Sequence, residues 1–101
     1  MKAYLHLIKY ALKNKCTISV FDGEAWDVKR STKYKEIKES AECSDATQLR
    51  IRDQAGEIVG WALVSDAIDF EPEETVIDHT ITPFMDAWSS DYSAHQDGVK
   101  Q

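Results

Sequence analysis

Hydrophobic residues near the start of the chain recur with the spacing of an amphipathic helix. They follow the 3.6-residue repeat between Ala3 and Asn14, at positions Tyr4, Leu5, Leu7, Ile8, Ala11 and Leu12. This pattern predicts a helix over Ala3–Asn14. Asn14 and Lys15 suit its end, because Asn tolerates the left-handed conformation and Lys complements the helix dipole.

The next segment has the pattern of a hairpin. Thr17–Phe21 is rich in β-branched residues, and Asp22-Gly23 follows at once. An Asp-Gly pair between two apolar runs is typical of a type I′ turn, in which both central residues need positive φ. We expect Trp26 and Val28 to line one face of the return strand, with Trp26 as a core anchor.

A second helix and a second hairpin follow. Lys33–Glu42 favours a helix, with Ser31 or Thr32 as its cap. Thr47–Asp53 then alternates, so that Leu49 and Ile51 share one face and Arg50 and Arg52 the other. Gln54-Ala55-Gly56 predicts a short turn.

The return strand of this second hairpin, Glu57–Val64, is apolar on both faces. That pattern is typical of a central strand or of one covered on each side. Gly60 inside it indicates a bulge or the close approach of another backbone.

The last third is acidic at first and then helical. Ser65–Glu74 contains Pro72 and predicts a loop, and Thr75–Thr80 fits either a short edge strand or an irregular bridge. Thr82-Pro83 is a good helix start, after which Phe84, Trp88 and Tyr92 form an aromatic stripe. We expect this helix to fade near Ala94.

These elements predict an α+β fold. Its antiparallel sheet of about four strands is built from the two hairpins, with helices at the N-terminus, between the hairpins and at the C-terminus. The helices would cover one face of the sheet. We expect a single domain over residues 1–96 and a frayed tail over residues 97–101.

Composition narrows the class of protein. The chain has 101 residues, 43% of them hydrophobic, and no run of the roughly 18 apolar residues that a membrane span needs. Ala3–Leu12 lacks the pattern of a signal peptide. We therefore expect a soluble cytoplasmic domain without membrane contact, in which Cys16 and Cys43 are free thiols.

Charge is distributed unevenly along the chain. The formal net charge is −6, but residues 1–52 carry eleven Lys and Arg against seven Asp and Glu, a balance of +4. Residues 53–101 carry one Lys against eleven Asp and Glu, a balance of −10. Such asymmetry is typical of an electrostatic interaction surface, although the halves could also neutralise each other in the fold.

Catalytic and metal-binding patterns are weak. The possible metal ligands, Cys16, Cys43, His6, His79 and His95, lack the paired spacing of zinc sites. Asp78-His79 is the one acid–histidine neighbour pair, and strand neighbours point to opposite faces. The four glycines form no phosphate-binding loop. We predict neither a metal nor a cofactor, and no enzymatic activity.

Three surfaces are candidates for partner binding. The acidic surface comprises Asp66, Asp69, Glu71, Glu73, Glu74 and Asp78, whose carboxylates would attract a basic partner. The aromatic helix would add Trp88 and Tyr92, if they are not core residues. A basic patch of Lys29, Arg30, Lys33 and Lys38, joined by Arg50 and Arg52 and interleaved with Trp26 and Tyr34, is the alternative for nucleic acid.

Several runs in this sequence resemble small uncharacterised proteins of tailed bacteriophages and prophages. They are residues 17–31, Arg50-Ile51-Arg52-Asp53, residues 60–64 and residues 78–88. The resemblance implies an accessory protein that acts in the bacterial host cytoplasm by binding a host factor. It assigns no role to any residue.

The sequence therefore suggests a non-enzymatic interaction module that binds a host protein through the acidic surface. A nucleic-acid-binding accessory protein that uses the basic patch is the alternative, and a second copy of the chain is another possible partner. The remaining hypothesis is a small enzyme that uses Asp78, His79 or a cysteine.

Overall fold

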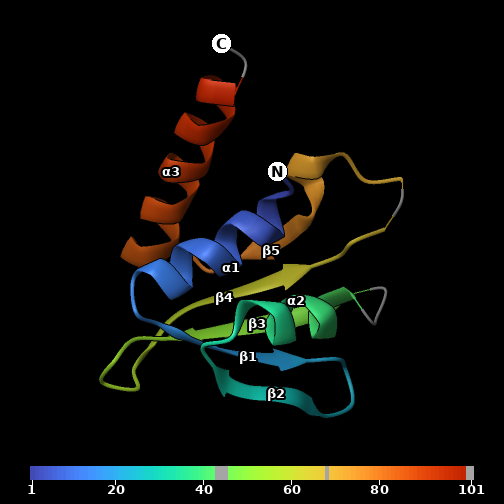
Figure 1. The fold of residues 1–101 in the computed structure, drawn as a ribbon, viewed down its shortest axis with the longest axis vertical. Helices are drawn as coiled ribbons and strands as arrows, with labels where there is room; N and C mark the ends of the chain where they lie inside the picture. Colours follow the sequence, from blue (N-terminus) through green and yellow to red (C-terminus); the bar gives the residue numbers. More distant parts are fainter. Residues whose placement is uncertain (43–45, 68, 100–101) are drawn as a thin grey trace.

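The computed structural model describes residues 1–42, 46–67 and 69–99 (Figure 1). Three helices, a five-stranded sheet and a short 3₁₀ turn make up this part of the chain. In order they are α1 (Ala3–Lys13), β1 (Thr17–Phe21), β2 (Trp26–Ser31), α2 (Tyr34–Glu42), β3 (Thr47–Arg52), β4 (Ile58–Val64), η1 (Pro72–Glu74), β5 (Val76–His79) and α3 (Pro83–Val99). The α+β class is confirmed.

The sheet has one strand more than the two hairpins predict. Its order is β2-β1-β3-β4-β5, and every neighbouring pair is antiparallel. The fifth strand is the segment whose pattern fitted either an edge strand or a bridge. It has only four residues, and its pairing with β4 is interrupted at Ile77. Such a short, irregular edge strand leaves little period in the sequence.

One face of the sheet is covered by helices. α1 and α2 lie side by side over it, and α3, which follows β5, packs against β4 and α1 (Figure 1). The strands turn their fully buried residues toward this layer, among them Ile18, Val20, Leu49, Ile51, Ala62 and Val64. Alternation along each strand then places the other set of side chains on a face that no described helix covers.

The first hairpin forms with a longer loop than the type I′ turn that the sequence suggests. Phe21 pairs with Trp26, and Asp22–Ala25 form the loop. The Asp22 carboxylate accepts hydrogen bonds from the backbone N–H groups of Glu24 (2.9 Å) and Ala25 (3.0 Å). Gly23 takes positive φ and Asp22 does not. The Asp side chain therefore closes the turn in place of a left-handed backbone.

The return strand also departs from the predicted pattern. Val28 is buried, whereas Trp26 lies half-buried outside the core. Val20 pairs with Val28 and the adjacent Phe21 pairs with Trp26, so Asp27 is an extra residue in β2. This bulge turns Trp26 and Val28 to opposite faces.

α3 is longer than the sequence predicts, because it continues to Val99 through the region expected to fray. Its start is fixed to the sheet by a close approach between Met85 and Gly60. A Cβ on Gly60 would lie 2.6 Å from Sδ of Met85. The glycine in the apolar strand therefore marks a close approach, but by a side chain and not by another backbone; the irregular pairing of β4 with β3 lies next to it, at Val59.

No helix in the described ranges is long and apolar enough to cross a membrane. Cys16 is buried and free. Burial, together with the Asp53 carboxylate, raises the pKa of its thiol. Cys43 lies outside the described residues.

Candidate basic interface on the open sheet face

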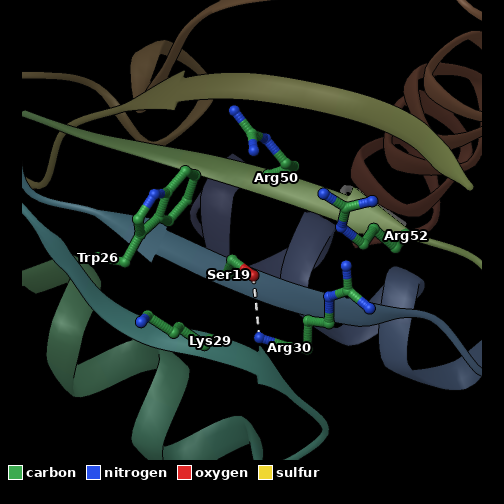
Figure 2. A pocket seen from close by; sticks show the side chains of 6 residues that line it. All are labelled: Ser19, Trp26, Lys29, Arg30, Arg50 and Arg52. Atoms are coloured by element: carbon green, nitrogen blue, oxygen red, sulfur yellow. Dashed lines mark hydrogen bonds between the residues drawn. The ribbon is translucent and has the colours of Figure 1, made fainter. Parts of the chain in front are cut away.

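A hollow of about 400 Å³ lies on the open face over β1, β2 and β3 (Figure 2). Six side chains line it: Ser19, Trp26, Lys29, Arg30, Arg50 and Arg52. They project from the face of the sheet opposite α1 and α2. Four of the six are cationic, and one is a large aromatic ring. We call this group the basic hollow.

A second bulge places two cations of β2 in the basic hollow. Ile18 pairs with Ser31 and Val20 with Val28, so Ser19 faces both Lys29 and Arg30. Because Val28 and Ser31 are turned inward and buried, the two residues between them share the outer face. Arg30 has a φ of 47°. Its backbone N–H donates to Oγ of Ser19 over 2.9 Å.

The other two cations follow from regular alternation in β3. Leu49 and Ile51 are completely buried, while Arg50 and Arg52 stand on the open face. Arg50 pairs across the sheet with Ser19 on one side and Trp61 on the other. The sequence prediction that the arginines lie opposite the apolar pair is therefore confirmed.

Trp26 and Arg50 contact each other in the lining of the basic hollow. The guanidinium carbon of Arg50 lies 4.5 Å from the centroid of the Trp26 ring, within the range of a cation–π contact. Phe21 packs against Trp26 with their centroids 5.1 Å apart. One N–H of Arg52 donates to the carbonyl oxygen of Gly56 over 2.9 Å, which leaves the remaining guanidinium donors available.

Among the described residues, the four cations of the basic hollow have no acidic partner. In the described ranges, ion pairs involve Lys2, His6, Lys35 and Lys38, and none involves Lys29, Arg30, Arg50 or Arg52. Gathering like charges on one surface is unfavourable unless an anion neutralises them. The arrangement is therefore suited to a polyanionic ligand.

The basic patch expected from the sequence is divided by the fold. Lys29 and Arg30 line the basic hollow, whereas Lys38 belongs to α2, which covers the opposite face. Lys38 pairs there with Glu42 over 2.5 Å. Lys33 is exposed just before α2 begins. Sequence neighbours thus end up on different sides because the chain crosses the sheet edge at Ser31.

The acidic surface lies at the other edge of the sheet, on the segment from the end of β4 to β5. Five of its members are exposed: Asp69, Glu71, Glu73, Glu74 and Asp78. Asp66 is partly buried and pairs with Lys2. Burial and then the Asp66 carboxylate raise the pKa of Tyr4. Because β2 and β5 are the two edges, the basic and acidic groups are held apart across the sheet.

The aromatic stripe of α3 is part of the core. Trp88 is 4% exposed and Tyr92 is 8% exposed, and they stack with their centroids 6.0 Å apart. Tyr92 also donates its hydroxyl to the carbonyl oxygen of Met1 over 3.1 Å. These residues join α3 to α1, so they are not available as a free docking surface.

A smaller hollow of about 280 Å³ lies between α1 and α3. His6 stands in its wall, with Nε2 3.1 Å from an Asp91 carboxylate oxygen and Nδ1 accepting from the Trp88 indole over 3.1 Å. Burial is the main reason that the pKa of His6 is lowered; Asp91 opposes this effect and His95 adds to it. Both ring nitrogens are occupied, so His6 has no free nitrogen to act as a base.

The Asp78–His79 pair and the possible metal ligands do not form a site within the described residues. Asp78 accepts from the backbone N–H of His79 over 2.9 Å, while Nδ1 of His79 contacts the carbonyl oxygen of Thr80 over 2.8 Å. Strand alternation turns the two side chains to opposite faces. Within the described residues, no group of three or more His, Cys, Asp and Glu side chains could hold a metal ion.

Three residues of the open face were not predicted from the sequence to belong to a candidate surface: Ser19, Phe21 and Trp61. Trp61 is half-buried, and its indole N–H donates a hydrogen bond to the side-chain oxygen of Gln48 over 3.0 Å. The sequence signal was the alternation of β1 and β3, which assigns Ser19, Phe21 and Gln48 to the face opposite the core. For β4 that signal is masked, because its outer face is also apolar.

No protein-family model, curated protein or solved structure matches this chain.

Proposed function

We propose that the domain binds nucleic acid in the basic hollow. The observation that carries this proposal is that four cations line one hollow together with Trp26, and none of the four has an ion-pair partner among the described residues. Arginine is suited to phosphate because its planar fork donates two parallel hydrogen bonds. An aromatic ring among the cations adds a surface for base stacking.

The negative net charge of the chain is compatible with this function because the charges are segregated. A ligand at the β2–β1–β3 side of the sheet meets Lys29, Arg30, Arg50 and Arg52, while the exposed acidic surface lies toward the β5 edge. Local potential, not net charge, steers a charged ligand to its surface. The acidic edge would favour one orientation of approach.

The test is binding of a fluorescently labelled oligonucleotide, followed by anisotropy at several salt concentrations. We expect affinity to fall steeply with salt, since each neutralised phosphate releases counterions. The double variant Lys29→Ala/Arg30→Ala should bind more weakly. The slope of log affinity against log salt should also become shallower by about 1 to 2.

The matched control is Lys33→Ala/Lys38→Ala, which removes the same charge on the α2 side. It should bind like the unmodified protein. An equal loss in both variants would show that binding is diffuse and not centred on the basic hollow. No binding to single- or double-stranded oligonucleotides at low salt would overturn the proposal.

The acidic surface supports a second candidate function, the binding of a basic host protein. Its exposed carboxylates adjoin two exposed apolar residues, Ile77 (48%) and Ile81 (88%). A mixed acidic and apolar edge is suited to a partner with a basic rim and an apolar centre. This is the function that the phage resemblance also implies.

This candidate is tested by retention of bacterial proteins on the immobilised domain. Glu73→Lys/Asp78→Lys should lose a retained protein that Glu39→Lys/Glu42→Lys keeps. High salt should also release it. Equal retention by all three proteins would remove the acidic surface from the proposal.

A further inference from the structure

We infer that the nucleic acid bound on the open face is a single strand whose unpaired bases lie across the sheet from Trp26 to Trp61. This inference rests on the proposed function. It adds the form of the ligand and a second contact point, outside the lining of the basic hollow.

Strand register places two rows of outward side chains on the open face. The first row runs through Trp26, Phe21, Gln48 and Leu63, which pair in that order from β2 to β4. The second runs through Ser19, Arg50 and Trp61, with Lys29 and Arg30 at its β2 end. The first row therefore carries two aromatic rings, and the row beside it carries three cations and ends at Trp61.

Both indole rings are held in place on this face. Trp26 contacts both the Phe21 ring and the guanidinium of Arg50. Trp61 is fixed by its hydrogen bond to Gln48. Both tryptophans are half-buried. A ring that is ordered before binding loses little conformational entropy when a base stacks on it.

Stacking surfaces on a sheet suit unpaired bases. In a duplex the faces of the bases are covered by their neighbours, and only phosphates and groove edges remain accessible. A single strand can instead turn its bases toward aromatic side chains while its backbone follows a basic track. The paired rows on this face provide both features.

The dimensions indicate a ligand longer than one nucleotide. Trp26 and Trp61 stand on strands separated by β1 and β3, which corresponds to roughly 14 Å at ~4.8 Å per strand. The hollow beside Trp26, at about 400 Å³, has the size of a small-ligand pocket. Arg50 lies between the two rings and offers both charge and a planar stacking surface.

The experiment compares one labelled twelve-nucleotide sequence as single-stranded DNA, as single-stranded RNA and as a duplex. We expect either single strand to bind at least tenfold more tightly than the duplex at physiological salt. Tryptophan fluorescence should be quenched on binding. Comparing the affinities for single-stranded DNA and single-stranded RNA shows which of the two the domain prefers.

Two substitutions test the stacking contacts. Trp26→Ala and Trp61→Ala should each lower affinity for the single strand by roughly 5- to 160-fold, the range of one lost base–aromatic stack. Because they remove no charge, the salt dependence should stay unchanged. Trp61→Phe should keep most of the affinity, and Ile81→Ala, an exposed apolar residue outside the face, should keep all of it.

The outcomes separate this inference from the proposed function. Equal affinity for the duplex, or no effect of Trp61→Ala in a protein with an unchanged circular dichroism spectrum, would overturn the single-strand inference and leave the basic hollow standing. Absence of any nucleic-acid binding would overturn both. Equally tight binding of an acidic polyglutamate peptide would assign the face to polyanions in general and overturn recognition by stacking.

Discussion

The indole nitrogen of Trp88 donates a hydrogen bond to Nδ1 of His6 over 3.1 Å, which joins α3 to α1 inside the core. An indole N–H can only donate, so Nδ1 must be the unprotonated nitrogen of the ring. The proton of the neutral imidazole is then on Nε2, directed at Asp91. The structure therefore requires neutral His6 for a complete set of hydrogen bonds.

This arrangement predicts that stability falls as the pH drops below the ordinary pKa of histidine. Burial lowers the pKa of His6 in the folded state, so between that pKa and about 6.5 the unfolded chain binds more protons. The stabilisation is complete above this window and is lost as the pH falls through it. Urea unfolding at pH 7.5 and pH 5.5 should show the decrease.

Replacing the titrating ring provides the control. His6→Gln should be less stable than the unmodified protein at pH 7.5, yet it should lose less stability between the two pH values. His95 is an exposed neighbour that also lowers the pKa of His6. The variant His95→Gln should therefore retain most of the loss of stability between the two pH values. An unchanged pH dependence in His6→Gln would show that another group is responsible.

The start of α1 depends on a residue far away in the sequence. Oγ1 of Thr75 accepts from the backbone N–H of Tyr4 over 3.1 Å, while Lys2 supplies no side-chain cap. Thr75→Val keeps the shape but leaves this buried donor unpaired. We expect a loss of about 1–2 kcal/mol in the free energy of unfolding. Thr32→Val, at an exposed position, should change it by less than ~0.5 kcal/mol.

The contact between β4 and α3 leaves no room for a side chain at Gly60. A Cβ there would lie 2.6 Å from Sδ and 2.9 Å from Cγ of Met85. Gly60→Ala should therefore destabilise the protein by about 1–3 kcal/mol, the usual cost of overpacking. In a double-mutant cycle with Met85→Ala the two effects should not add, because that change removes both clashing atoms. Additive effects would place the strain elsewhere.

Regular alternation was readable from the sequence, and irregular pairing was not. Thr47–Arg52 keeps a strict period of two, so the opposite faces of Leu49 and Arg50 could be predicted. In β2 the same rule failed for Trp26 and Val28, because a bulge depends on the partner strand and leaves no local signal. The buried stripe of α1 could also be predicted, because its apolar residues keep the regular 3.6-residue repeat of a helix.

The candidate site illustrates the same limit. Its arginines and Trp26 could be grouped from composition and spacing, but the grouping also drew in Lys33 and Lys38, which follow Ser31. Only the register shows that the chain leaves the open face at Ser31, whose hydroxyl accepts from the N–H of Lys33 (3.0 Å) and donates to Glu36 (2.6 Å). Which cations share a surface is thus a property of the sheet.

The left-handed backbone at Arg30 allows stability and binding to be separated. A non-glycine residue at a φ of 47° bears a cost of about 1–2 kcal/mol that glycine avoids, offset by the greater chain entropy that glycine loses on folding. Arg30→Gly should therefore fold with unchanged stability, or gain up to about 1 kcal/mol. It should nevertheless bind the oligonucleotide more weakly, because one cation of the basic hollow is gone.

Lys15 is the matched control, because it also has positive φ (64°) and follows α1 outside the basic hollow. Lys15→Gly removes one positive charge and relieves the same kind of backbone strain. Urea unfolding should give both variants similar stability, while anisotropy should show weaker binding for Arg30→Gly alone. Equal loss of affinity in the two variants would mean that the ligand responds to net charge and not to the basic hollow.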